Sequence, residues 1–133
     1  MKEFIRSELT RLGYQVKDFG ALTFDPNDDY PIFSARVAAA VSKGEFERGI
    51  SVCGSGIGAS IAANRFRHVR AALCITAEMA ELSRRHNDAN MLVIGGRITT
   101  RETVTAILNA WLTTAFEAGR HSRRRDMLDD LKP

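Results

Sequence analysis

Residues 50–64, Ile-Ser-Val-Cys-Gly-Ser-Gly-Ile-Gly-Ala-Ser-Ile-Ala-Ala-Asn, carry the local pattern from which the rest of the chain can be interpreted. A short apolar run ends at Cys53, glycines follow at Gly54, Gly56 and Gly58, and the small apolar residues after them have helical spacing. The stretch predicts a strand, a glycine turn and a helix. Such a turn leaves backbone N–H groups unpaired at a helix N-terminus, where they favour an anion. Because the same environment stabilises a thiolate, we predict a reactive cysteine beside an oxyanion cradle.

The composition is that of an ordinary soluble globular protein. The 133 residues are 44% hydrophobic and 26% charged, and the length suits a single domain with one core. No apolar run approaches the length of a membrane span, and the first residues lack the pattern of a signal peptide. Cys53 and Cys74 do not have the spacing of a disulfide framework, so we expect reduced thiols in a cytoplasmic protein.

The net charge of +3 is modest, and its basic excess is local. Arg120, Arg123, Arg124 and Arg125 lie near the C-terminus together with His121. A solvated helix face is one interpretation, and a small phosphate-binding site is the other, because guanidinium groups suit phosphate. The wide basic face with aromatic residues that is typical of nucleic-acid binding is not evident.

Hydrophobic periodicity and turn residues divide the chain into alternating helices and strands. Helices are expected over residues 2–12, 31–44, 57–63, 76–85, 99–112 and 119–131, and strands over 14–19, 48–52, 69–74 and 91–94. This alternation predicts a three-layer, Rossmann-like α/β sandwich with a parallel sheet. Ligands of such folds gather at the carboxyl ends of strands, so we expect Cys53, residues 86–90 and Arg97 to share one site there.

Several candidate residues also have a purely structural interpretation. Cys74 lies inside an apolar strand without a glycine turn and is expected to be an inert, buried thiol. His86 could simply be a favourable partner of a helix C-terminus, but the polar run over residues 86–90 before an apolar strand favours a function. His68 is expected on a surface loop, and His121 either contacts a ligand or only occupies a helix surface.

Nucleotide and metal cofactors are not indicated. The glycine turn lacks the Lys-Ser/Thr of a P-loop, and its Gly-x-Gly-x-Gly spacing differs from the dinucleotide fingerprint. Glu78 stands at about the right distance for a ribose contact but lies in a predicted helix. No group of His, Cys, Asp and Glu residues has the sequence spacing of metal ligands.

Six segments occur in an order that is specific to one family. They are Asp29-Tyr-Pro31, Cys53-Gly-Ser-Gly-Ile-Gly58, Ile61-Ala-Ala-Asn64, Arg70-Ala-Ala72, His86-Asn-Asp-Ala-Asn90 and Gly119-Arg-His-x-x-Arg124. Together they resemble the type B ribose-5-phosphate isomerases and their galactose-6-phosphate isomerase relatives, over residues 9–128. The resemblance implies an aldose–ketose isomerase of a small sugar phosphate that uses neither metal nor nucleotide. Ribose 5-phosphate is the substrate expected first, and tetrose and hexose phosphates remain open.

The resemblance also implies roles for residues of the glycine turn. Cys53 matches the base that removes a proton from the carbon beside the sugar carbonyl, which gives an enediolate. The N–H groups over residues 54–58, which comprise Gly54, Ser55, Gly56, Ile57 and Gly58, would hold the negative charge that develops. Ser55 keeps a hydroxyl where the family often has threonine.

Other matched residues would handle the sugar ring and the phosphate. His86 matches the residue that opens the furanose ring by moving a proton to or from the ring oxygen. Asn87 would bind substrate hydroxyls, and Arg120 and Arg124 would form the phosphate clamp. Arg97 and Tyr30 are further candidates for substrate binding. In the family the clamp belongs to the neighbouring subunit, so a homodimer or tetramer with a shared site is implied.

One departure from the family concerns the N-terminus. Family members begin with a strand and an Asp-His-Ala-Gly-type turn whose Asp and His contact the substrate, whereas this chain starts inside the following helix. Loss of an inner parallel strand would cost more than the roughly 5–15 kcal/mol of typical domain stability, so we expect a misplaced start or a shortened chain rather than a natural short relative. The absence of the Asp-His turn also motivates an alternative function, that of a non-catalytic sugar-phosphate-binding or partner subunit.

Overall fold

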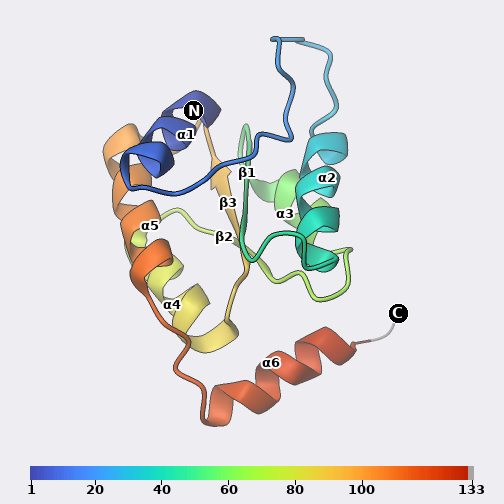
Figure 1. The fold of residues 1–133 in the computed structure, drawn as a ribbon, viewed down its shortest axis with the longest axis vertical. Coiled ribbons are helices and arrows are strands. Elements are labelled where there is room, and N and C mark those ends of the chain that lie inside the picture. Colours follow the sequence, from blue (N-terminus) through green and yellow to red (C-terminus); the bar gives the residue numbers. More distant parts are fainter. Residues whose placement is uncertain (132–133) are drawn as a thin grey trace.

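The computed structural model describes residues 1–131, which form six helices around a three-stranded parallel sheet. The elements are α1 (Lys2–Arg11), α2 (Tyr30–Ser42), β1 (Gly49–Cys53), α3 (Ile57–Ala63), β2 (Ala71–Leu73), α4 (Ala77–Asn87), β3 (Met91–Gly95), α5 (Arg101–Thr113) and α6 (Arg120–Asp130). The strand order is β1-β3-β2, and both pairings are parallel. Helices α1, α4 and α5 lie on one side of the sheet and α2 and α3 on the other, as Figure 1 shows. The predicted α/β sandwich is confirmed.

The central strand β3 separates two apolar cores. All five of its residues are buried, as expected for a parallel strand that is covered on both faces. Successive side chains of a strand point to opposite faces. Leu92 and Ile94 accordingly pack in the core that contains Trp111 of α5, whereas Met91 packs in the core that contains Val41 of α2.

Two threonines cap helices with their side chains, at or next to the starts of the predicted helices 76–85 and 99–112. The Thr76 hydroxyl accepts a hydrogen bond from the backbone N–H of Met79 at 3.1 Å, which caps α4. Thr100 caps α5, and its hydroxyl accepts from the N–H of Thr103 at 3.2 Å. A side-chain cap satisfies one of the N–H groups that a helix start leaves unpaired, and it typically contributes about 1 kcal/mol.

The predicted strand over residues 14–19 is wrong. This segment pairs with no strand in residues 1–131, and neither does the edge of β1 that faces away from β3. Residues 15–19 and β1 both line an apolar cavity of about 210 Å³, so the segment lies beside β1 at more than hydrogen-bonding distance. Tyr14 and Val16, the apolar residues of the alternation, are both exposed, so the pattern corresponds here neither to sheet pairing nor to burial.

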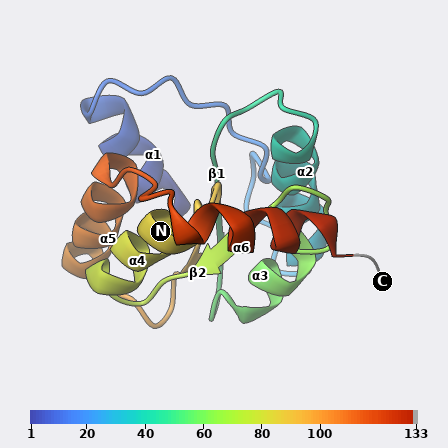
Figure 2. The same ribbon diagram turned by 90° about the horizontal axis from the view of Figure 1, so that it is seen from below.

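Helix α6 crosses the amino end of the sheet. It lies at the bottom of Figure 1, far from the tip of β3, and Figure 2 shows it from below as it runs across that end of the molecule. It confirms the helix expected over residues 119–131. No helix within the described residues has the length and apolar character needed to cross a bilayer.

Candidate functional site

The glycine turn places a cysteine thiol directly before the first turn of α3. Gly56 is the residue before α3 and has φ of +81°, a conformation that a side chain would strain. A Cβ at this position would also collide with Leu73. The resulting tight turn brings the Gly56 N–H to within 3.2 Å of the Cys53 Sγ, to which it donates a hydrogen bond. The sulfur therefore lies at the start of α3 with a backbone N–H aimed at it.

Other predicted residues surround this thiol. The Ser55 hydroxyl accepts from the N–H of Ile57 at 3.3 Å. The Tyr30 ring covers Gly58 so closely that a Cβ there would collide with it. The Arg97 N–H donates to the Gly54 carbonyl at 3.0 Å, and its guanidinium also lies against that glycine. The structure thus gathers Tyr30, Arg97 and the whole turn, Cys53 to Gly58, at the carboxyl end of β1; this group is called the thiol cluster below.

A second group of predicted residues lies where α4 ends and α6 begins. The His86 ring stacks on the His121 ring, with centroids 4.3 Å apart and planes inclined by 12°. His121 is only 5% exposed, and burial, together with the neighbouring charge of His86, lowers the pKa of its imidazole below the ordinary value. It is therefore mostly uncharged at neutral pH, so that it packs beneath His86 as a flat neutral surface.

The remaining members of this second group face solvent. Arg120 and Arg124 are exposed and four residues apart, which places them on the same face of α6. Neither guanidinium pairs with a carboxylate in the described part of the chain, whereas Arg125 next to them pairs with Asp126. Asn87 is exposed as well, at the end of α4. His86, Asn87, Arg120, His121 and Arg124 are called the histidine–arginine cluster below.

Sequence reasoning missed one residue of this cluster's surroundings. Glu117, between α5 and α6, lies with its Oε2 3.8 Å from the His86 Nε2 and 3.3 Å from the Arg85 Nη2. Its N–H also donates to the Arg85 carbonyl at 3.0 Å. It belongs to a connection without periodic pattern, so no signal in the sequence pointed to it.

The same neighbourhood brings together three potential metal ligands, which sequence spacing did not predict. One ligand atom each from His86, Glu117 and His121 lies within 4.8 Å of the others. However, the lone pair of an imidazole nitrogen lies in the ring plane, and these two planes are nearly parallel. The arrangement therefore does not converge on one metal position.

The expectation that residues 86–90 lie near the carboxyl ends of the strands, beside Cys53 of the same chain, is wrong. Cys53 is paired with Gly95 at the carboxyl end of the sheet, whereas residues 86–90 immediately precede Met91 at the amino end. The five residues of β3 separate these ends by about 13 Å. The physical reason is connectivity. In a parallel sheet, the helix between two strands returns the chain from the carboxyl ends of the strands to their amino ends. Only Arg97, which follows β3, joins the thiol as expected.

The second cysteine provides a check on the assignment of the reactive one. Cys74 is 1% exposed, and burial raises the pKa of its thiol to about 11. We expect iodoacetamide at pH 8 to alkylate Cys53 in the folded protein while Cys74 stays unmodified, as measured by peptide mass mapping. Denatured protein, in which both thiols should react, is the control. Alkylation of Cys74 at the rate of Cys53 would contradict the assignment.

Comparison with known proteins gives concordant matches over nearly the whole chain. A family profile described as Ribose/Galactose Isomerase matches residues 1–128. Ribose-5-phosphate isomerase B of Escherichia coli (strain K12) is 42% identical over 132 residues, which cover 99% of this chain and 88% of that protein.

Solved structures match at a similar level. A ribose 5-phosphate isomerase of Thermotoga maritima superimposes with a TM-score of 0.93 at 41% identity, over 98% of this chain and 89% of that one. Ribose-5-phosphate isomerase B of Mycoplasma genitalium, solved with bound ribulose-5-phosphate, gives a TM-score of 0.92 at 39% identity, over 96% of this chain and 85% of that one.

Proposed function

The chain belongs to the ribose/galactose isomerase family, and on that basis we propose that it interconverts ribose 5-phosphate and ribulose 5-phosphate. The observation that carries the proposal is the Cys53 thiol, which accepts a hydrogen bond from the Gly56 N–H at 3.2 Å in a turn that a side chain would block. Such a site offers a base and backbone donors side by side, which proton abstraction next to a carbonyl requires.

The reaction needs three proton movements. The Cys53 thiolate takes the proton from C2 of the open-chain aldose, and the electron pair moves through the C1–C2 bond to give an enediolate. Its negative charge is held by backbone N–H groups of the glycine turn. The same thiol then returns the proton to C1, while the Ser55 hydroxyl moves a proton from O2 to O1. The product is the ketose, with all protons accounted for.

The histidine–arginine cluster has the chemistry for opening the sugar ring and for binding the phosphate. The imidazole of His86 opens the furanose ring by protonating the ring oxygen and accepting the proton of the C1 hydroxyl. Arg120 and Arg124, exposed on one face of α6, bind the phosphate, and the amide of Asn87 binds sugar hydroxyls. Tyr30 and Arg97 border the thiol and bind the sugar from that side.

We further propose that two copies of the chain build each site. Within one chain the two clusters lie at opposite ends of the sheet, so one small sugar phosphate cannot reach both. The side chains of Tyr30, Ile32, Ile57 and Ile61, on α2 and α3 near the thiol cluster, are each about half exposed, which suits a contact with a second copy. A two-fold dimer would bring the histidine–arginine cluster of each copy to the thiol cluster of the other. Pairs of dimers would give a tetramer with the same sites.

The remaining features fit one metabolic enzyme domain. Both apolar cores pack on the same sheet, which supports a single domain over residues 1–133. The two free thiols suit a reducing compartment such as the cytoplasm. The arginines of α6 are assigned to the phosphate rather than to nucleic acid.

The direct test is the conversion of ribose 5-phosphate by the purified 133-residue chain, followed by detection of the ketose product. We expect turnover with ribose 5-phosphate and little or none with ribose, which lacks the phosphate that the arginines bind. A correctly folded chain that binds ribose 5-phosphate without converting it would contradict the proposal. That result would favour the alternative of a non-catalytic sugar-phosphate-binding subunit, and conversion of a tetrose or hexose phosphate alone would change the substrate.

A further inference from the structure

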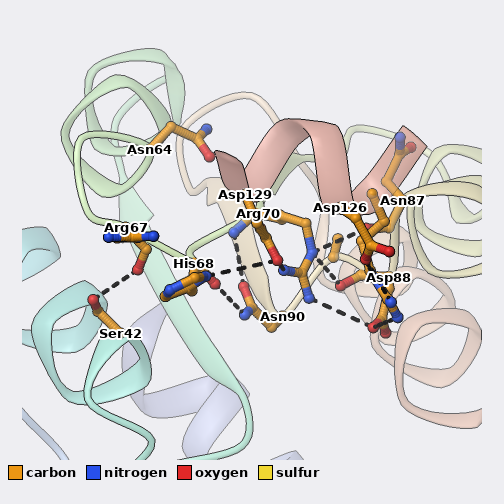
Figure 3. A network of polar contacts seen from close by, with 12 residues as sticks. Ser42, Asn64, Arg67, His68, Arg70, Asn87, Asp88, Asn90, Asp126 and Asp129 are labelled. Atoms are coloured by element: carbon orange, nitrogen blue, oxygen red, sulfur yellow. Dashed lines mark hydrogen bonds and ion pairs between the residues drawn. The ribbon is translucent and has the colours of Figure 1, made fainter. Parts of the chain in front are cut away.

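Arg70 connects the two elements that carry the histidine–arginine cluster. It lies just before β2, and its side chain is 14% exposed. Its Nη1 donates to both carboxylate oxygens of Asp129 on α6, at 2.8 Å each. Its Nε donates to the main-chain carbonyls of Asn87 and Asp88, at 3.1 and 3.0 Å. One guanidinium therefore ties the end of α4 to α6, as Figure 3 shows.

The residue after Asn87 reinforces this connection. Asp88 ends α4 in the left-handed conformation, with φ of +48°. Its carboxylate pairs with Arg84 at 2.9 Å, with Arg70 at 3.5 Å and with Arg125 of α6 at 3.6 Å. The chain directly after His86 and Asn87 is thus fixed by three guanidinium groups, one of which belongs to α6.

Apolar packing contributes little to the position of α6. Of its eleven residues only His121, in the first turn, is buried. Leu128, toward its other end, is about half exposed and lines, with Arg70 and Asn87, a cavity of about 380 Å³. Burial of apolar surface normally positions a helix, so polar contacts must do more of this work here. At the end of α6 that lies away from the histidine stack, Asp129 pairs with Arg70 at 2.8 Å and lies 3.8 Å from the Nδ1 of His68.

We propose that Arg70 is a positioning residue for substrate binding: it holds α6 so that the phosphate-binding arginines keep a fixed place relative to His86 and Asn87. This inference rests on the proposed function. Without the anchor at Asp129, α6 can tilt about the buried His121. Arg124 lies almost one helical turn from that point, so a tilt displaces its guanidinium, and shifts of about 1 Å are enough to weaken a substrate clamp.

The test is Asp129→Asn, which removes the charge from the pair but leaves the bonds from Arg70 to the α4 carbonyls in place. We expect KM for ribose 5-phosphate to rise roughly five- to tenfold, as for the loss of a partly buried ion pair, with kcat within about twofold of wild type. The affinity for inorganic phosphate, measured by calorimetry, should fall by the same factor. A general loss of structure would instead lower kcat and the melting temperature.

Two variants serve as controls. Asp129→Glu keeps the carboxylate and should restore most of the affinity. Glu8→Gln breaks a pair of similar length, 2.9 Å to Arg11 on α1, and should change neither constant. Unchanged KM and phosphate affinity in Asp129→Asn would overturn the inference, and so would a joint collapse of kcat and stability. If the wild-type chain proves not to isomerise, the proposed function fails, and the phosphate affinities still decide the role of Arg70.

Discussion

Cys53→Ala is expected to abolish isomerisation while leaving the binding of ribose 5-phosphate nearly intact. The substitution removes the only group in the thiol cluster that we assign to proton abstraction from C2, and positioned bases typically contribute factors of about 10²–10⁴ to the rate. Binding should persist, because the arginines and the amide of the histidine–arginine cluster are untouched. The measurements are kcat from the ketose assay and the dissociation constant from calorimetry.

Cys74→Ala is the matched control, since that thiol is buried in the core and has no role in the mechanism. It should keep kcat near the wild-type value even if it lowers stability by leaving a small cavity. Turnover by Cys53→Ala within about tenfold of wild type would remove Cys53 from the role of base. A loss of binding in Cys53→Ala, with the fold intact, would instead assign the residue to substrate recognition.

The sequence predicted those parts of the molecule in which local pattern and tertiary structure agree. The apolar run at residues 91–94 became the central strand because burial on both faces requires such a run. Thr76 and Thr100 cap helices because a hydroxyl at that position satisfies local N–H groups whatever the rest of the fold does. The glycine turn could be predicted for the same reason, since its geometry is set within a few residues.

Features that depend on non-local arrangement were not predictable in this way. Residues 14–19 have the alternation of a strand, but pairing also requires a neighbouring ladder at hydrogen-bonding distance, which a local pattern cannot report. The distance between Cys53 and His86 follows from the direction in which α4 returns the chain, not from any property of either residue. Arg70 and Asp129 are 59 positions apart, so no local pattern could indicate their pairing.

Within one chain the thiol cluster and the histidine–arginine cluster lie at opposite ends of the sheet. A mixed dimer of two inactive variants should therefore regain activity. Consider one copy with Cys53→Ala and the other with His86→Ala, co-expressed with different affinity tags and purified through both. If each site takes its thiol from one copy and its histidine from the other, one of the two sites in this dimer is intact and the other lacks both groups. We therefore expect about half of the wild-type turnover on cyclic ribose 5-phosphate, far above either parent.

The reciprocal combination makes the experiment decisive. A dimer of the wild-type chain with the double variant Cys53→Ala/His86→Ala again contains one Cys53, one His86 and two alanines at these positions. Both native residues now belong to the same copy, so that every shared site lacks either its thiol or its histidine. Shared sites predict a dimer that is nearly inactive, whereas sites confined to one chain predict half of the wild-type turnover. For the dimer of the Cys53→Ala copy with the His86→Ala copy the expectations are reversed: shared sites predict half of the wild-type turnover, and sites confined to one chain predict almost none. An inactive mixed dimer in the first case and an active one in the second would refute the shared site, and they would require His86 to reach Cys53 within one chain, against the direction of the parallel strands.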